Sequence, residues 1–204
     1  MRLFKRLLNP NYKPDDKTKK SEASEQSSYY PEETVPADEK FMLNFKRNGG
    51  KFIYCEDWNE ILDAFDNILL ENDWYEQDVF CYDKQLMQRF DGFNLNFTSN
   101  ADSKFLFSTC EALIAHRGEI MLSSRQMREK KLGDLPEDVI IFATTSQIVE
   151  TLSDGLRIIN TKRSGTIPSN ITTIQHFKIK ESEDDFMSYG SSSKNLYLLL
   201  LEDL

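Results

Sequence analysis

The sequence predicts an α/β protein built on an open, mostly parallel sheet with helices on both faces. Short apolar runs typical of strands alternate with segments in which apolar residues recur at helical spacing, the pattern of strand–helix–strand units. The run 195–201 is apolar at nearly every position, which indicates a strand covered on both faces, and 138–145 also contains a continuous apolar run. The 204 residues are enough for one medium-sized domain with a self-sufficient core.

Helices and strands alternate in the first part of the domain. A helix over 37–50 ends at a glycine pair, and the run 51–55 (KFIYC) is a short strand. Asp57 can cap the following helix by accepting hydrogen bonds from its first turn. The strand 78–82 then precedes a short helix around Met87. The apolar face of the helix after Asp57 consists of Trp58, Ile61, Leu62, Phe65, Ile68 and Leu69.

Strands predominate in the middle of the chain. The alternating segment 93–98 is a third strand, and 104–108 and 119–123 are further strands on either side of a tight segment, 109–118. The run 138–145 (DVIIFATT) is the clearest buried strand.

A helix is expected directly after that strand. Ser146 is placed to cap it, and the inward residues at helical spacing are Ile148, Val149, Leu152, Leu156 and Ile159. The run 195–201 (NLYLLLL) is expected to be a central strand of the sheet.

The chain divides into a disordered N-terminal tail, residues 1–37, and a folded domain, residues 38–204. Residues 13–39 are rich in Lys, Asp, Glu, Ser and Pro and cannot bury enough apolar surface to offset the entropy of ordering. The first residues, MRLFKRLL, have apolar side chains at helical spacing with basic ones between them. They form either a short helix that touches anionic lipid or a partner, or a frayed terminus, and the run is too short for a secretory signal.

Composition argues against several classes of function. The net charge of −9 and the pI of about 4.9 disfavour nucleic acid as the main partner, because an acidic surface repels phosphate backbones. The three cysteines, Cys55, Cys81 and Cys110, are far apart and contain no Cys-x-x-Cys pair, so no metal, cluster or other cofactor is expected. This cysteine usage suits the reducing cytoplasm, and no apolar run is long enough to span a membrane.

Ligands of open α/β sheets usually bind at the carboxyl ends of the strands. Those ends are expected at 109–118, 123–131, 144–147 and 164–174. At 144–147, the hydroxyls of Thr144, Thr145 and Ser146 and a helix N-terminus can hold an anion, although plain capping by Ser146 explains the same pattern.

The segment 109–122 (TCEALIAHRGEIML) contains the candidate catalytic groups. Glu111 can act as an acid, a base or a nucleophile, or it is a carboxylate at a helix start. Arg117 can clamp a carboxylate, and His116 is either a working group or an exposed loop residue. Gly118 permits a tight turn and, with Ser123, is a candidate ligand contact. Arg125 and Arg128 follow in a charged run, which is usually a solvated face.

Several linked short motifs resemble the LUD domain, a family named for lactate utilisation. They are ALIAHRGEI at 112–120, Leu135-Pro136, VIIFA at 139–143 and Gln147-Ile148-Val149. The resemblance covers about residues 38–204 and is nearest to a short branch typical of Bacteroidetes-type bacteria. It implies a fold like that of sugar-phosphate isomerases and coenzyme A transferases.

The resemblance also implies a ligand loop at 167–174, where the family reads Gly-Pro-Ser-Arg-Thr-Ala-Asp-Ile. Pro168, Ser169 and Ile174 match, whereas the glycine, the arginine and the aspartate are replaced. In the turn at 115–119, His116-Arg117 replaces a Glu-Thr pair. The charged groups suited to an anion are therefore missing from the loop. Either the ancestral activity is lost or a new ligand is bound, through Ser169, Asn170, Thr172 and Thr173.

Three functions remain open at the level of the sequence, and whether the protein is an enzyme stays undecided. The first is an accessory or non-catalytic LUD-domain protein of lactate or organic-acid utilisation, working beside iron–sulfur lactate-oxidation proteins. The second is an enzyme acting on a small carboxylate or sugar phosphate through Glu111, His116 and Arg117. The third is an adaptor that uses the basic N-terminus.

Overall fold

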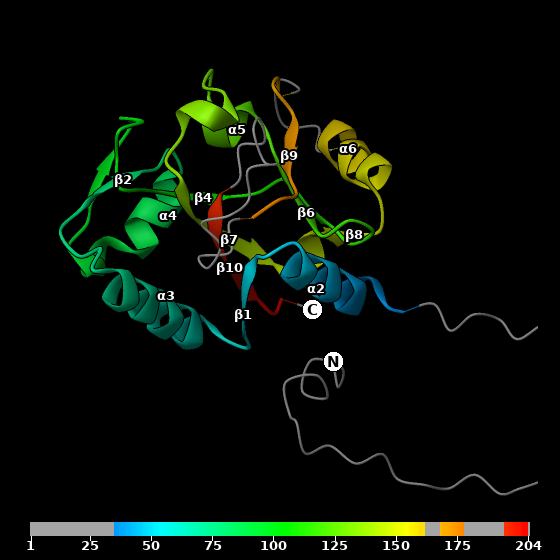
Figure 1. The fold of residues 1–204 in the computed structure, drawn as a ribbon, viewed down its shortest axis with the longest axis horizontal. Helices are drawn as coiled ribbons and strands as arrows, with labels where there is room; N and C mark the ends of the chain where they lie inside the picture. Colours follow the sequence, from blue (N-terminus) through cyan, green and yellow to red (C-terminus); the bar gives the residue numbers. More distant parts are fainter. Residues whose placement is uncertain (1–34, 162–167, 178–193, 204) are drawn as a thin grey trace, which may run out of the picture.

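The computed structural model describes residues 35–161, 168–177 and 194–203, which form two β-sheets covered by helices (Figure 1). The larger sheet is fully parallel, with the strand order β1-β10-β7-β4-β2-β3. Its strands are β1 (Lys51–Cys55), β2 (Asp78–Phe80), β3 (Asn96–Thr98), β4 (Phe105–Thr109), β7 (Asp138–Thr144) and β10 (Asn195–Leu201). The fold class expected from the sequence is thereby confirmed.

Two helices, α3 (Trp58–Asn72) and α4 (Lys84–Arg89), cover one face of this sheet. The Asp57 carboxylate caps α3 as expected, accepting hydrogen bonds from the N–H groups of Asn59 and Glu60. The Asp83 carboxylate caps α4 in the same way. The helices bury their apolar faces against alternate residues of the strands, such as Phe105 and Phe107 of β4.

The other face is covered by α2 (Ala37–Arg47), the short α5 (Ser124–Met127) and a smaller sheet. The smaller sheet has the order β8-β5-β6-β9. Its strands are β5 (Ala112–Ile114), β6 (Glu119–Leu122), β8 (Ile148–Val149) and β9 (Thr172–Ile174). Helix α6 (Leu152–Thr161) packs on its far side and buries Ile159 there. Figure 1 shows α3 and α4 on one side of the large sheet and α6 outermost on the other.

The centre of the large sheet is β10, which lies between β1 and β7. Its residues 195–200 are buried, as the apolar run predicted. A strand covered on both faces by helices or a second sheet has no solvated side. The residues that point to either face are therefore apolar.

The chain around the smaller sheet differs from the sequence-based expectation in two places. The tight segment 109–118 contains β5, which forms an antiparallel hairpin with β6. The helix expected from Ser146 is instead a 3₁₀ turn η3 (Thr145–Gln147), the strand β8, and only then α6. The β-branched Ile148 and Val149 pair with β5, and Thr151 accepts a hydrogen bond from the N–H of Asp154 at the start of α6. Two further 3₁₀ turns are η1 (Asp91–Phe93) and η2 (Leu132–Asp134).

The predicted N-terminal tail falls mainly on residues 1–34, which lie outside the described part of the chain. The first described helix, α2, begins at Ala37, next to the expected domain boundary. Within the described ranges, none of the helices has the length and apolar character needed to cross a membrane.

Candidate functional site

The connections after β2 and β4 leave the large sheet in opposite directions. After β2 the chain continues into α4, whose Leu86 packs in the core on the α3 side. After the neighbouring β4 the chain enters the smaller sheet, whose Leu113 packs in the core on the other side. A reversal of this kind between adjacent parallel strands opens a crevice at their carboxyl ends, where ligands of open α/β sheets bind.

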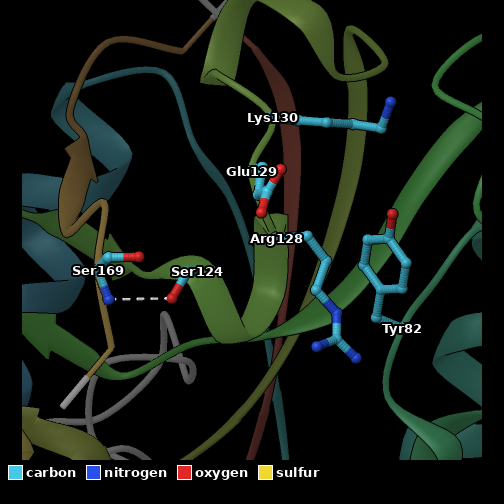
Figure 2. Close-up of a pocket in the computed structure, with 6 residues that line it drawn as sticks. All are labelled: Tyr82, Ser124, Arg128, Glu129, Lys130 and Ser169. Atoms are coloured by element: carbon cyan, nitrogen blue, oxygen red, sulfur yellow. Dashed lines mark hydrogen bonds between the residues drawn. The ribbon is translucent and has the colours of Figure 1, made fainter. Parts of the chain in front are cut away.

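A pocket of about 510 Å³ is lined by residues that surround this crevice (Figure 2). Tyr82 follows β2, Ser124 lies in α5, Arg128 to Lys130 follow α5, and Ser169 precedes β9. The pocket lining consists of Tyr82, Ser124, Arg128, Glu129, Lys130 and Ser169. This lining contains two cationic side chains and one carboxylate, so its net charge favours a negatively charged ligand.

Ser124 and Ser169 form one wall of the pocket through a reciprocal pair of hydrogen bonds. The N–H of Ser169 donates to the Ser124 hydroxyl oxygen at 3.0 Å, and the N–H of Ser124 donates to the Ser169 carbonyl at 2.9 Å. The Ser124 oxygen acts as the acceptor in this pair. Its own hydrogen can therefore be donated to a ligand.

Arg128 forms the opposite wall together with Tyr82. The guanidinium carbon lies over the Tyr82 ring, 5.0 Å from its centroid. Figure 2 shows the two side chains next to each other. The backbone of Arg128 has a φ of 57°, in the region that favours glycine. Non-glycine residues in such conformations cluster at functional sites.

Glu111 and Ser123 lie together at the base of α5. The Ser123 hydroxyl donates to the Glu111 carboxylate at 2.6 Å and accepts a hydrogen bond from the N–H of Arg125. The guanidinium of Arg125 pairs with the other Glu111 oxygen at 3.4 Å. The Glu111 side chain is only 4% exposed, and both its oxygens have partners. This carboxylate therefore holds in place the helix that supplies Ser124 to the pocket.

His116, Arg117 and Gly118 lie at the opposite end of the β5–β6 hairpin from Glu111. The side-chain amide of Asn44 in α2 donates to the carbonyl of His116, and the amide of Asn48 donates to that of Arg117 at 2.7 Å. The structure thus docks this turn against α2 and does not bring its residues together with Glu111. The Arg117 guanidinium pairs with buried Glu119 at 3.0 Å.

The threonines and serine after β7 bind a carboxylate of the chain itself. The hydroxyl of Thr145 donates to Asp203 at 2.9 Å, and both the N–H and the hydroxyl of Ser146 donate to it. Thr144 contacts the Ser146 hydroxyl at 3.0 Å. Desolvation raises the pKa of Asp203, but these hydrogen bonds outweigh it and lower the pKa to about 2. The anion cradle expected from the sequence is therefore filled by Asp203.

The described part of the candidate ligand loop is built into the smaller sheet. Pro168 is buried, and Asn170 is exposed with a φ of 52°. Thr172 and Thr173 belong to β9, where they pair with β6 residues. Of the loop residues proposed as ligand contacts, Ser169 is the one that lines the pocket.

Cys55 and Cys81 are buried thiols. Burial is the main reason that their pKa values rise to about 12, so both remain protonated at neutral pH. Within the described ranges, no three His, Cys, Asp or Glu side chains lie close enough together to hold a metal ion.

Sequence reasoning missed most of the pocket lining. It placed 123–131 at the carboxyl end of a strand and noted Arg128, but interpreted the run as a solvated face. Tyr82 and Arg128 are more than 40 residues apart in the sequence, and no local pattern indicates that they contact each other. The positive φ at Arg128 is likewise invisible in the sequence.

These features define an α/β protein with a cationic pocket at the topological switch point of a parallel sheet. The chain belongs to the LUD domain family, because the model of that family matches residues 39–200. A solved structure with a similar fold is a DUF162 family protein from Deinococcus radiodurans, with a TM-score of 0.52 and 14% sequence identity. The match covers 80% of this chain and 94% of that one. No curated protein matches the sequence.

Proposed function

We propose that this LUD-domain protein binds a small organic anion, a carboxylate or a phosphorylated compound, in the switch-point pocket. The observation that supports the proposal is that Arg128, Lys130 and Ser124 all line one hollow. Two cations and a hydrogen-bond donor match the charge and the oxygen atoms of such a ligand.

The proposed role is an accessory, non-catalytic one in lactate or organic-acid utilisation in the cytoplasm. The internal pairing of Glu111 with Ser123 and Arg125 supports a non-catalytic role, because both carboxylate oxygens are already engaged. The separation of Glu111 from His116 and Arg117 supports it as well. Redox steps would then belong to partners such as iron–sulfur lactate-oxidation proteins, which fits the two buried, protonated thiols.

A thermal-shift screen with lactate, pyruvate, acyl-coenzyme A and sugar phosphates tests the proposal. A bound ligand at about 100 times its Kd stabilises the fold by about 2.7 kcal/mol, which raises Tm by roughly 5–10 °C. Lys130→Ala is expected to weaken binding of that ligand by about tenfold, because it removes one of the two cations.

Lys104→Ala is the matched control. Lys104 is exposed, and it lies immediately before β4, at the amino end of that strand, whereas the pocket lies at the carboxyl ends. This variant removes the same charge and should leave the Kd unchanged. If none of the compounds shifts Tm, or if both variants weaken binding equally, the pocket is not the binding site and the proposal fails.

A further inference from the structure

Arg128 occupies a backbone position that the fold would fill more easily with glycine. Its φ of 57° and ψ of −127° place it at the first central position of a type II′ turn. The N–H of Lys130 donates to the Met127 carbonyl at 3.2 Å and closes the turn. Glycine dominates this position because a Cβ is strained there.

Among the described residues, neither an ion pair nor a backbone hydrogen bond calls for an arginine at position 128 of this turn. The backbone N–H of Arg128 donates to the Ser124 carbonyl, a hydrogen bond that glycine would make equally well. Carboxylates pair with the guanidinium groups of Arg117, Arg125 and Arg157, but none among the described residues pairs with Arg128. The contact of Arg128 with the fold is its position over the Tyr82 ring.

The guanidinium keeps its hydrogen-bond donors for a ligand. Among the described residues none accepts a hydrogen bond from it, so its N–H groups remain available for a pair of oxygen atoms. The Ser124 hydroxyl lines the same pocket and has a hydrogen to donate. Together they fit an anion that presents two oxygens to the arginine and a third acceptor to the serine.

We infer that Arg128 is the specificity-determining residue of the pocket, and that it binds two oxygens of a carboxylate or phosphate with its guanidinium fork. An arginine at this position of the turn after α5 lowers the stability of the fold, because its backbone is strained there. The inference rests on the proposed function, because it names the residue and the chemistry by which that pocket would select its ligand.

Three variants of the full-length chain test the inference: Arg128→Gly, Arg128→Ala and Arg128→Lys. Without ligand, Arg128→Gly is expected to unfold at least about 2 °C above Arg128→Ala. Ordinarily alanine is the more stable of the two. Because both variants lack the contact with Tyr82, the difference isolates the backbone strain.

Binding is measured with pyruvate as the carboxylate probe and inorganic phosphate as the phosphate probe. The probe that binds more tightly shows whether the pocket selects a carboxylate or a phosphate. All three variants are expected to lose at least about tenfold in affinity for that probe. The affinity of Arg128→Lys shows whether Arg128 binds the probe through paired hydrogen bonds or through its charge alone. Lysine keeps the charge but lacks the paired donors.

The inference is wrong if Arg128→Lys binds like the wild type, or if Arg128→Gly is no more stable than Arg128→Ala. The proposed function survives that outcome provided that the wild type binds a probe and Lys130→Ala weakens it. A wild-type protein that binds neither probe and none of the screened compounds overturns both.

Discussion

At the scale of single residues, Gly118 decides how the smaller sheet docks on the rest of the fold. Its φ is +64°, and a Cβ there would lie 2.5 Å from the Asn44 carbonyl carbon and closer still to the Phe45 nitrogen. The turn can approach α2 this closely only without a side chain. The amides of Asn44 and Asn48 then reach the carbonyls of the turn.

Gly118→Ala is therefore expected to destabilise the fold by roughly 3 kcal/mol, because strain and a backbone clash act together. For a chain of this size that lowers Tm by roughly 6–12 °C, which calorimetry resolves. Gly133→Ala is the matched control, since a Cβ at Gly133 meets nothing within 4 Å. Equal Tm values for the two variants would contradict this account of the turn.

At the scale of elements, the long buried strands and the helix capped by Asp57 were predictable from the sequence, and the short strands β5 and β8 were not. Strand β10 and helix α3 are long enough for the spacing of their apolar residues to identify them as a strand and a helix. Strands β5 and β8 have three and two residues, too few to show a period, and they exist because neighbouring strands pair with them. The pocket escaped prediction for a related reason: Tyr82 and Arg128 meet only after the large sheet and α5 are assembled.

The end of β10 is fastened by Asp203, and this contact predicts a pH dependence. The folded-state pKa of Asp203 lies near 2, below its ordinary 3.8, so folding favours the ionised carboxylate. Its contribution to stability is complete above about pH 4 and disappears as the pH falls toward 2.

Asp203→Asn is expected to reduce the free energy of unfolding by roughly 1 kcal/mol at pH 7, after allowance for the exposure of the group. Urea midpoints of the wild type and this variant should converge between about pH 4 and pH 2. A gap that persists at pH 2 would mean that Asp203 acts through something other than its charge.

At the scale of the whole molecule, the described residues form layers: α3 and α4, the large sheet, the smaller sheet with α2, and α6 (Figure 1). Helix α2 belongs to this body, because Phe41 and Phe45 are fully buried in its core. The residues before it belong to the predicted tail, for which the composition of 13–39 is the argument.

Removal of residues 1–34 is therefore expected to change Tm by no more than about 2 °C. Removal of residues 1–47, which also deletes α2, should prevent stable folding, because it exposes the surface that Phe41 and Phe45 cover. Thermal unfolding of both shortened variants checks the domain boundary. A large loss of stability in the first would show that the tail packs on the domain.

The central position of β10 also determines when the large sheet can close during synthesis on the ribosome. Strands β1 and β7 flank β10 and are synthesised before it, and 50 residues separate Thr144 from Asn195. At a synthesis rate of about 5–20 residues per second, those residues take roughly 3–10 s to be added. Throughout that interval the nascent chain has two unpaired apolar strand edges, which are templates for pairing with other chains. The large sheet can therefore close only after β10 has been added, and until then the chain has the kind of surface to which chaperones bind.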